Sequence, residues 1–139
     1  DTPGSGEFVA DQLGPLSPGA GHLVHMPSHI YLRIGRYHDA SVANEKAASA
    51  DESYITQCGA QGFYPALYYP HNIHFLYASS AFEGRSEVSI AAARKLSKNM
   101  TPELVAAVPL AEEFVPMASY ALARFGRWDD IMEIPQPSA

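Results

Sequence analysis

Three short segments in which a glycine is followed by an arginine constrain the fold of this chain more than any other feature. They are centred on Gly35, Gly84 and Gly126, which lie 49 and 42 residues apart. Each segment separates two stretches whose apolar spacing is typical of helices, and glycine commonly ends a helix. This arrangement predicts an all-α fold of about three stacked helix–turn–helix units that bury their faces against one another.

The expected helical domain covers residues 20–134. Residues 1–19 are rich in turn-forming residues and are expected to be a disordered or linker-like segment, with one or two weak helical turns at most over 8–13. Residues 135–139 are expected to be a disordered tail. Pro27 interrupts the first expected helix. Either the helix kinks there, which we favour, or it begins at Pro27, with His22 and His25 in the segment that precedes it. The expected helices cover 20–34, 37–57, 70–83 and 86–98, a helix that opens at Thr101, and then 117–125 and a short one from 127.

Charge and composition exclude several classes of partner. The net charge is −6 with nine lysines and arginines in 139 residues and no basic run, so nucleic acid and anionic membranes are poor partners. No apolar run reaches the roughly 18–20 residues of a membrane span, which predicts a soluble protein whose location stays open. The single cysteine forms no internal disulfide. The first residues lack Met and indicate a fragment of a longer chain.

Two His-x-x-His pairs occupy the same place in the repeat. His22 and His25 precede Gly35 by the same intervals at which His71 and His74 precede Gly84. Residues three apart on a helix lie about 60° apart around its axis, so each pair shares one face. Helices at corresponding positions of successive repeats are usually neighbours. We therefore expect the two histidine faces to meet.

Clustered neutral imidazoles are suitable ligands for zinc, copper, nickel or iron. We expect a transition-metal site formed by His25, His71 and His74, with His22 and His29 as alternates. His22 and His29 are separated by about 10.5 Å along a helix axis, so one ion does not easily bind both. An open ligand position would let the ion activate water or bind oxygen, but no residue identifies a substrate.

Two other interpretations of the histidines stay open. They would form a hydrogen-bonded structural cluster, since a duplicated unit also inherits residues for packing reasons, or they would be catalytic without a metal. Whether the protein is an enzyme is therefore not decided by the sequence.

Two further residues have expected environments that bear on the site. Asp51 lies off the apolar stripe that Ala40 and Ala47 share with other residues of the second expected helix, so Asp51 is expected to face solvent. Cys58 is expected to be a small buried residue rather than a metal ligand.

Two phrases of the sequence resemble a known family. They are HMPSHI at 25–30, followed by Gly35-Arg36-Tyr37, and YPHNIHFL at 69–76. The chain resembles larger bacterial tetratricopeptide-repeat proteins over roughly residues 20–96. The resemblance implies a helical-repeat fold and a chain that is an internal or C-terminal piece; it supplies no reaction.

The repeat fold also leads to a second function hypothesis. A helical-repeat array presents a concave face that binds a peptide or a partner protein, and the histidines would then be structural. The exposed end of a truncated array would also favour a homodimer.

Overall fold

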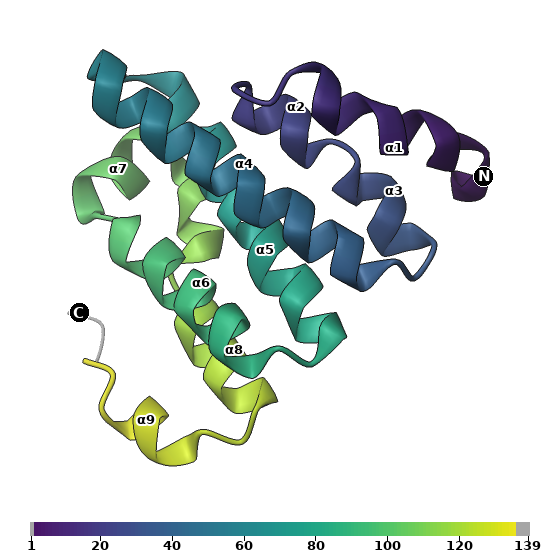
Figure 1. Ribbon diagram of the computed structural model, residues 1–139. Helices are drawn as coiled ribbons and strands as arrows, with labels where there is room; N and C mark the ends of the chain where they lie inside the picture. The colour runs from purple at the N-terminus through teal and green to yellow at the C-terminus, as the bar shows by residue number, and fades with distance from the viewer. Residues whose placement is uncertain (1, 136–139) are drawn as a thin grey trace.

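The computed structural model describes residues 2–135, and this part of the chain contains helices and no strands (Figure 1). The all-α prediction is therefore confirmed. The expected tail falls largely on residues 136–139, which lie outside the described residues. The helices are α1 (Glu7–Leu16), α2 (Gly21–His25), α3 (Ser28–Arg33), α4 (Tyr37–Cys58), α5 (Tyr69–Glu83), α6 (Ser86–Asn99), α7 (Pro102–Ala107), α8 (Met117–Arg124) and α9 (Trp128–Met132).

Shorter helical turns complete the backbone. They are the 3₁₀ turns η1 (Pro3–Gly6) and η3 (Pro109–Phe114) and the π-helical turn η2 (Tyr64–Tyr68), which leads directly into α5. The linker expected over residues 1–19 is wrong for its central part, because α1 forms there. Ala10 on α1 is buried against Tyr31 and Ala40, so tertiary packing holds this short helix in place.

Glycines end the helices as the sequence predicts. Gly35, Gly84 and Gly126 have φ angles of 83°, 84° and 68°, in the left-handed region that glycine adopts without strain. The Thr101 side chain caps α7 by accepting a hydrogen bond from the Leu104 N–H at 3.2 Å, also as expected.

Pro27 breaks the first expected helix rather than bending it. Helix α2 ends at His25 and α3 begins at Ser28, with a turn at Met26 and Pro27. Proline lacks an N–H, and its ring clashes with the carbonyl four residues back, so the hydrogen-bond ladder is interrupted here. The single kinked helix expected over 20–34 is therefore corrected to two short helices.

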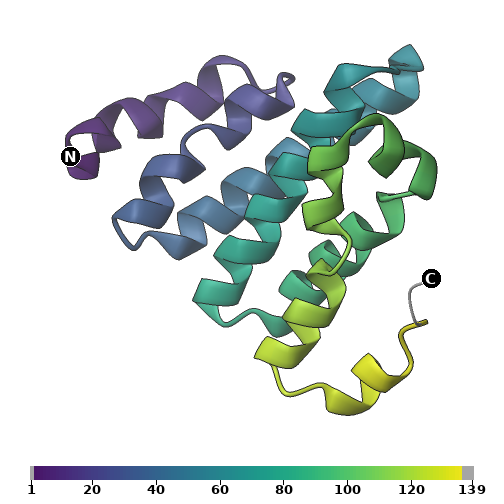
Figure 2. The ribbon, with the colours of Figure 1, turned by 180° about the vertical axis from the view of Figure 1, so that it is seen from behind.

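The helices pack in chain order. Helices α2 and α3 both lie against α4, α4 packs against α5, α5 against α6, and α6 against α8. Figures 1 and 2 show the N-terminal and C-terminal helices at opposite ends of this arrangement. The largest buried cluster joins α4, α5, α6 and η3, and the partly buried Leu104 and Val105 of α7 pack against it. Its buried residues are Ala48, Tyr69, Ile73, Ala92, Leu96, Met100 and Ala111.

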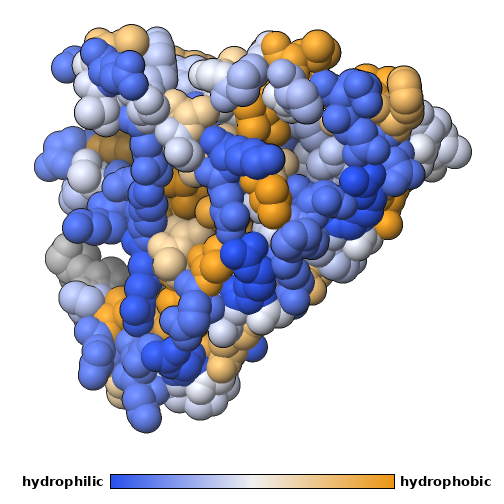
Figure 3. Space-filling view, in the orientation of Figure 1, coloured by the Kyte–Doolittle hydropathy of each residue, from blue (hydrophilic) through white to orange (hydrophobic). Residues whose placement is uncertain are grey.

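The outer surface carries mixed side chains. On the face seen in Figure 3, hydrophilic residues dominate and hydrophobic ones form small separate groups between them. No helix within residues 2–135 combines the length and apolar character needed to span a bilayer.

Candidate functional site

His25 is the centre of the site. It lies on α2, its side chain is fully buried, and its Nδ1 is 2.7 Å from Asn44 Oδ1 on α4. The Asn44 amide donates through Nδ2 to the Ala40 carbonyl at 2.7 Å, so its oxygen is the atom left to accept from His25. His25 therefore carries its hydrogen on Nδ1 and turns an unprotonated Nε2 toward its other neighbours.

Two more imidazoles meet His25 at this nitrogen. His25 Nε2 is 3.0 Å from His29 Nε2 and 3.1 Å from His71 Nε2. His29 comes from α3, just after the break at Pro27, and His71 from the first turn of α5. Three ring nitrogens from three helices thus converge on one point.

His22 completes a group of four. Its ring centroid lies 5.3 Å from that of His25 and 5.8 Å from that of His71. Ligand atoms of His22, His25 and His71 all lie within 4.8 Å of one another. His22 Nδ1 is buried and has no hydrogen-bond partner among the described residues, so this nitrogen is free to act as a ligand.

Aromatic rings enclose the cluster. The Phe75 ring packs against His25, His29 and His71, with centroids 4.7, 4.4 and 4.8 Å apart. Tyr68 covers His22 at a centroid distance of 4.4 Å. These rings cover part of the imidazole surface, so electrostatic interactions there are stronger than in open solvent.

Burial keeps these imidazoles neutral. It lowers the pKa of His25 from 6.5 to about 3; the hydrogen bond to Asn44 opposes this effect, and the neighbouring histidines add to it. Burial, followed by the neighbouring imidazoles, lowers the pKa of His71 to about 4. The pKa of His29 is also lowered by burial. Neutral imidazole is the form that binds metals.

His74 lies outside this group, although the sequence places it in the expected metal site. Its ring packs against Tyr77 and Phe114, with centroids 5.9 and 5.4 Å away. Burial lowers its pKa, and the Glu113 carboxylate opposes that shift. The structure therefore brings together His22, His25, His29 and His71 but does not bring His74 to them.

A buried polar network behind the histidines is not predicted by the sequence. Asp51 was expected to face solvent, but its side chain is 1% exposed. Its Oδ1 accepts from the Tyr64 hydroxyl and its Oδ2 from Asn72 Nδ2, both at 2.7 Å. Burial raises the pKa of Asp51, and these two hydrogen bonds oppose the shift. Helical spacing could have indicated this burial. Asp51 lies four residues after Ala47 and Asn44 three residues before it, so all three share the buried face of α4.

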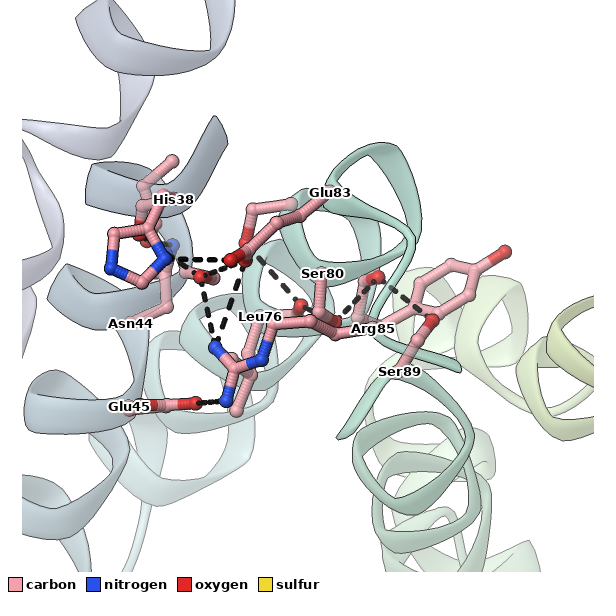
Figure 4. A network of polar contacts seen from close by, with 12 residues as sticks. His38, Asn44, Glu45, Leu76, Ser80, Glu83, Arg85 and Ser89 are labelled. Atoms are coloured by element: carbon pink, nitrogen blue, oxygen red, sulfur yellow. Dashed lines mark hydrogen bonds and ion pairs between the residues drawn. The ribbon is translucent and has the colours of Figure 1, made fainter. Parts of the chain in front are cut away.

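A second polar cluster joins α4 to the end of α5 and to the turn before α6 (Figure 4). Glu83 Oε1 accepts from His38 Nδ1 at 2.6 Å, and Glu83 Oε2 accepts from Ser41 Oγ at 2.5 Å. Arg85 donates to Ser41 at 3.2 Å and to Glu45 at 2.8 Å. The cluster ties the start of α4 to the end of α5. The Glu83 carboxylate thus lies between the His38 ring and the Ser41 hydroxyl and links the two helices.

An open groove lies apart from the histidines. It has a volume of about 1180 Å³ and is lined mainly by residues of α1 and α4, including Asp11, Lys46 and Tyr54. Cys58 lies at its end and is exposed, so the expectation that this cysteine is buried is wrong.

Comparisons with protein-family models, with curated proteins and with solved structures found no match to this chain. The site is therefore interpreted from its own geometry.

Proposed function

We propose that this protein binds a transition metal ion through the imidazoles of His25 and His71, with His22 and His29 as further ligands. Zinc, copper, nickel and iron are the candidate metals, since clustered neutral imidazoles suit all four. Cys58 is exposed and the nearby donors are nitrogens, which favours Zn²⁺, Cu²⁺ and Ni²⁺ over Cu⁺.

One observation carries the proposal: the ring nitrogens of His29 and His71 both face the same nitrogen of His25. A neutral imidazole has one lone pair on Nε2, so it accepts one good hydrogen bond and not two. A cation among these nitrogens would use a lone pair from each ring. In a tetrahedral site with zinc–nitrogen bonds of roughly 2.0–2.1 Å, the ligand nitrogens are about 3.3–3.4 Å apart. The observed separations of 3.0 and 3.1 Å are close to that spacing.

Asn44 supplies the outer support that such a site needs. Metal-binding histidines usually donate their second ring N–H to a carbonyl or carboxylate oxygen, which fixes the tautomer. The contact between His25 Nδ1 and Asn44 Oδ1 has this arrangement at 2.7 Å.

The scaffold of this site is, in our proposal, a tetratricopeptide-like repeat. Helices α4 and α6 each begin two residues after the glycine turns at Gly35 and Gly84. The successive packing of α4, α5 and α6 agrees with hairpins stacked along one axis.

Elemental analysis of the untagged protein tests the proposal. The protein is incubated in turn with Zn²⁺, Cu²⁺, Ni²⁺ and Fe²⁺, dialysed, and compared with His71→Ala and His74→Ala. His74 is a matched control, because it lies one turn further along α5 and its ring packs elsewhere. We expect about one metal ion per chain in the parent and in His74→Ala, and loss of the metal in His71→Ala.

Two outcomes would contradict the metal site. A parent protein that stays metal-free with all four ions leaves the imidazoles as a structural cluster, and the groove between α1 and α4 becomes the surface to test for a peptide partner. Equal loss of metal in the two variants would show that the effect is not specific to the cluster.

A further inference from the structure

The buried carboxylate of Asp51 connects the segments that carry the site histidines. Its two hydrogen-bond donors are Tyr64 in η2 and Asn72, which follows His71 on α5. The Tyr64 hydroxyl in turn accepts from the backbone N–H of His22 at 3.2 Å. One carboxylate on α4 therefore fixes the positions of both His22 and His71.

Gly21 shows how closely the carboxylate fits against α2. A Cβ atom placed on Gly21 would lie 1.9 Å from Asp51 Oδ1 and 2.8 Å from the Ala47 carbonyl oxygen. Only glycine lets the backbone beside His22 approach Asp51 to this distance. The position of Asp51 thus depends on the same residue that begins α2.

Asp51 is buried without a permanent cation. None of the ion pairs within residues 2–135 includes it, and its hydrogen-bond donors are a phenol and an amide, both neutral. Burial raises the pKa of Asp51, and among the groups that oppose this shift is His22, a member of the metal cluster. A buried charge is costly unless an opposite charge lies near it.

A metal ion bound only by neutral imidazoles carries a positive charge that its ligands do not compensate. Imidazole ligands such as His22, His25 and His71 leave a divalent ion with its full charge of two, because they donate electron pairs without cancelling that charge. In a site shielded from water, a negative charge nearby stabilises the ion over several ångströms.

We infer that Asp51 is a positioning residue and the counter-charge of the histidine site, favouring divalent cations over monovalent ones. This inference rests on the proposed metal binding and adds to it the residue that sets affinity for the charge of the ion. Through its hydrogen bonds with Tyr64 and Asn72, Asp51 positions His22 and His71. Through its negative charge, it stabilises the positive charge of the bound ion.

The test measures Zn²⁺ affinity by competition with a chelator in four proteins: the parent, Asp51→Asn, Tyr64→Phe and Glu45→Gln. Asp51→Asn keeps the shape and removes the charge, so Zn²⁺ affinity should fall roughly 10- to 100-fold. Tyr64→Phe keeps the charge and removes the two hydrogen bonds of the hydroxyl, one donated to Asp51 and one accepted from the His22 N–H, so a smaller loss is expected. Glu45→Gln removes a carboxylate from the same helix that pairs with Arg85, and its affinity should stay within about threefold of the parent.

Ag⁺ distinguishes charge from a merely structural role. Coulomb energy scales with the charge of the ion, so the loss of log affinity in Asp51→Asn should be about half as large for Ag⁺ as for Zn²⁺. Equal losses for the two ions, or a loss in Tyr64→Phe as large as in Asp51→Asn, would overturn the counter-charge role. If the Asn variant does not fold by circular dichroism, Asp51→Ser, which leaves room for water, takes its place.

The experiment distinguishes failure of the counter-charge role of Asp51 from failure of metal binding itself. A parent that binds Zn²⁺ together with an Asp51→Asn variant of unchanged affinity overturns the role of Asp51 alone. A parent that binds neither Ag⁺ nor any of Zn²⁺, Cu²⁺, Ni²⁺ and Fe²⁺ overturns metal binding and, with it, the role of Asp51.

Discussion

The two His-x-x-His pairs share a sequence frame but have different surroundings. His22 and His25 both reach the cluster, whereas His71 reaches it and His74 packs against Tyr77 and Phe114. The partner on the following helix accounts for part of the difference. Asn44 lies nine residues after Gly35 and binds His25, while the position nine residues after Gly84 is Ala93, which is fully buried and offers no side-chain acceptor.

The break at Pro27 accounts for another part. Because the helix is divided there, His25 lies on α2 and His29 on α3, and their Nε2 atoms are 3.0 Å apart. In the second unit, α5 is continuous, and the position that corresponds to His29 is Ala78. A repeated motif therefore predicts which helix face a residue occupies, but the neighbouring helix decides what that residue contacts.

Acid should have the largest effect, because it acts on both pairs. In the folded metal-free protein the pKa of His25 is about 3 and that of His71 about 4, both below the usual 6.5. The unfolded chain takes up protons below about pH 6.5 while the folded protein does not, so stability is full above that pH and falls as the pH drops toward 4 and then 3. Each histidine contributes a slope of about 1.4 kcal/mol per pH unit in this window.

Urea unfolding of the metal-free protein between pH 8 and pH 4 measures this loss. The His25→Gln variant is the control, because its loss across the same range should be smaller by the contribution of one histidine. A free energy of unfolding that is constant from pH 7 to pH 4.5 would show that the imidazoles are not held neutral by burial.

Substitution of single histidines should separate the two pairs next. His25→Ala removes a fully buried ring and leaves the Asn44 oxygen without its donor, which should cost about 3–5 kcal/mol of stability. His74→Ala removes a partly buried ring with two aromatic contacts, and about 1–2 kcal/mol is expected. Chemical denaturation at pH 7.5 without metal gives both values; equal losses would contradict the difference in burial.

The sequence predicts the all-α class and most helix ends because the signals for them are local. Glycine at a helix end and threonine before proline at a helix start depend on backbone geometry within a few residues, and Gly35, Gly84 and Thr101 act as expected. Helix α1 is longer than the one or two turns expected over 8–13, for the opposite reason. Pro15 and its neighbouring glycines indicate a break locally, and only packing of Ala10 against Tyr31 and Ala40 shows that the helix is retained.

The site is predictable in part for the same reason. Spacing alone places His22, His25 and His71 on inward faces, but the choice between His29 and His74 depends on side-chain packing between helices. Asp51 shows the limit most clearly, because a carboxylate on a helix is usually solvated. Its burial follows from Tyr64, Asn72 and the absence of a side chain at Gly21, which lie 13, 21 and 30 residues away in the chain.

The smallest change in stability is expected for Asn44→Ala. This variant tests the contrast between the two histidine pairs directly, because it gives His25 the same neighbour that His74 has at the equivalent position. Asn44→Ala places alanine where the second unit has Ala93, and it leaves the Nδ1–H of His25 without its acceptor at 2.7 Å. The cost should be about 1–2 kcal/mol. The Asn44 side chain loses its hydrogen bonds with His25 and with the Ala40 carbonyl, while Ser28 Oγ, 3.3 Å from His25 Nδ1, offers a partial substitute. Nitrogen-15 NMR of the imidazoles reports the tautomer: His25 should be a single Nδ1–H form in the parent and a mixture in Asn44→Ala.

The conservative Asn44→Asp keeps an acceptor and should keep the single form. An unchanged tautomer in Asn44→Ala would mean that the other histidines, rather than α4, set the orientation of His25, and the contrast between the two units would then have to arise from the break at Pro27 alone.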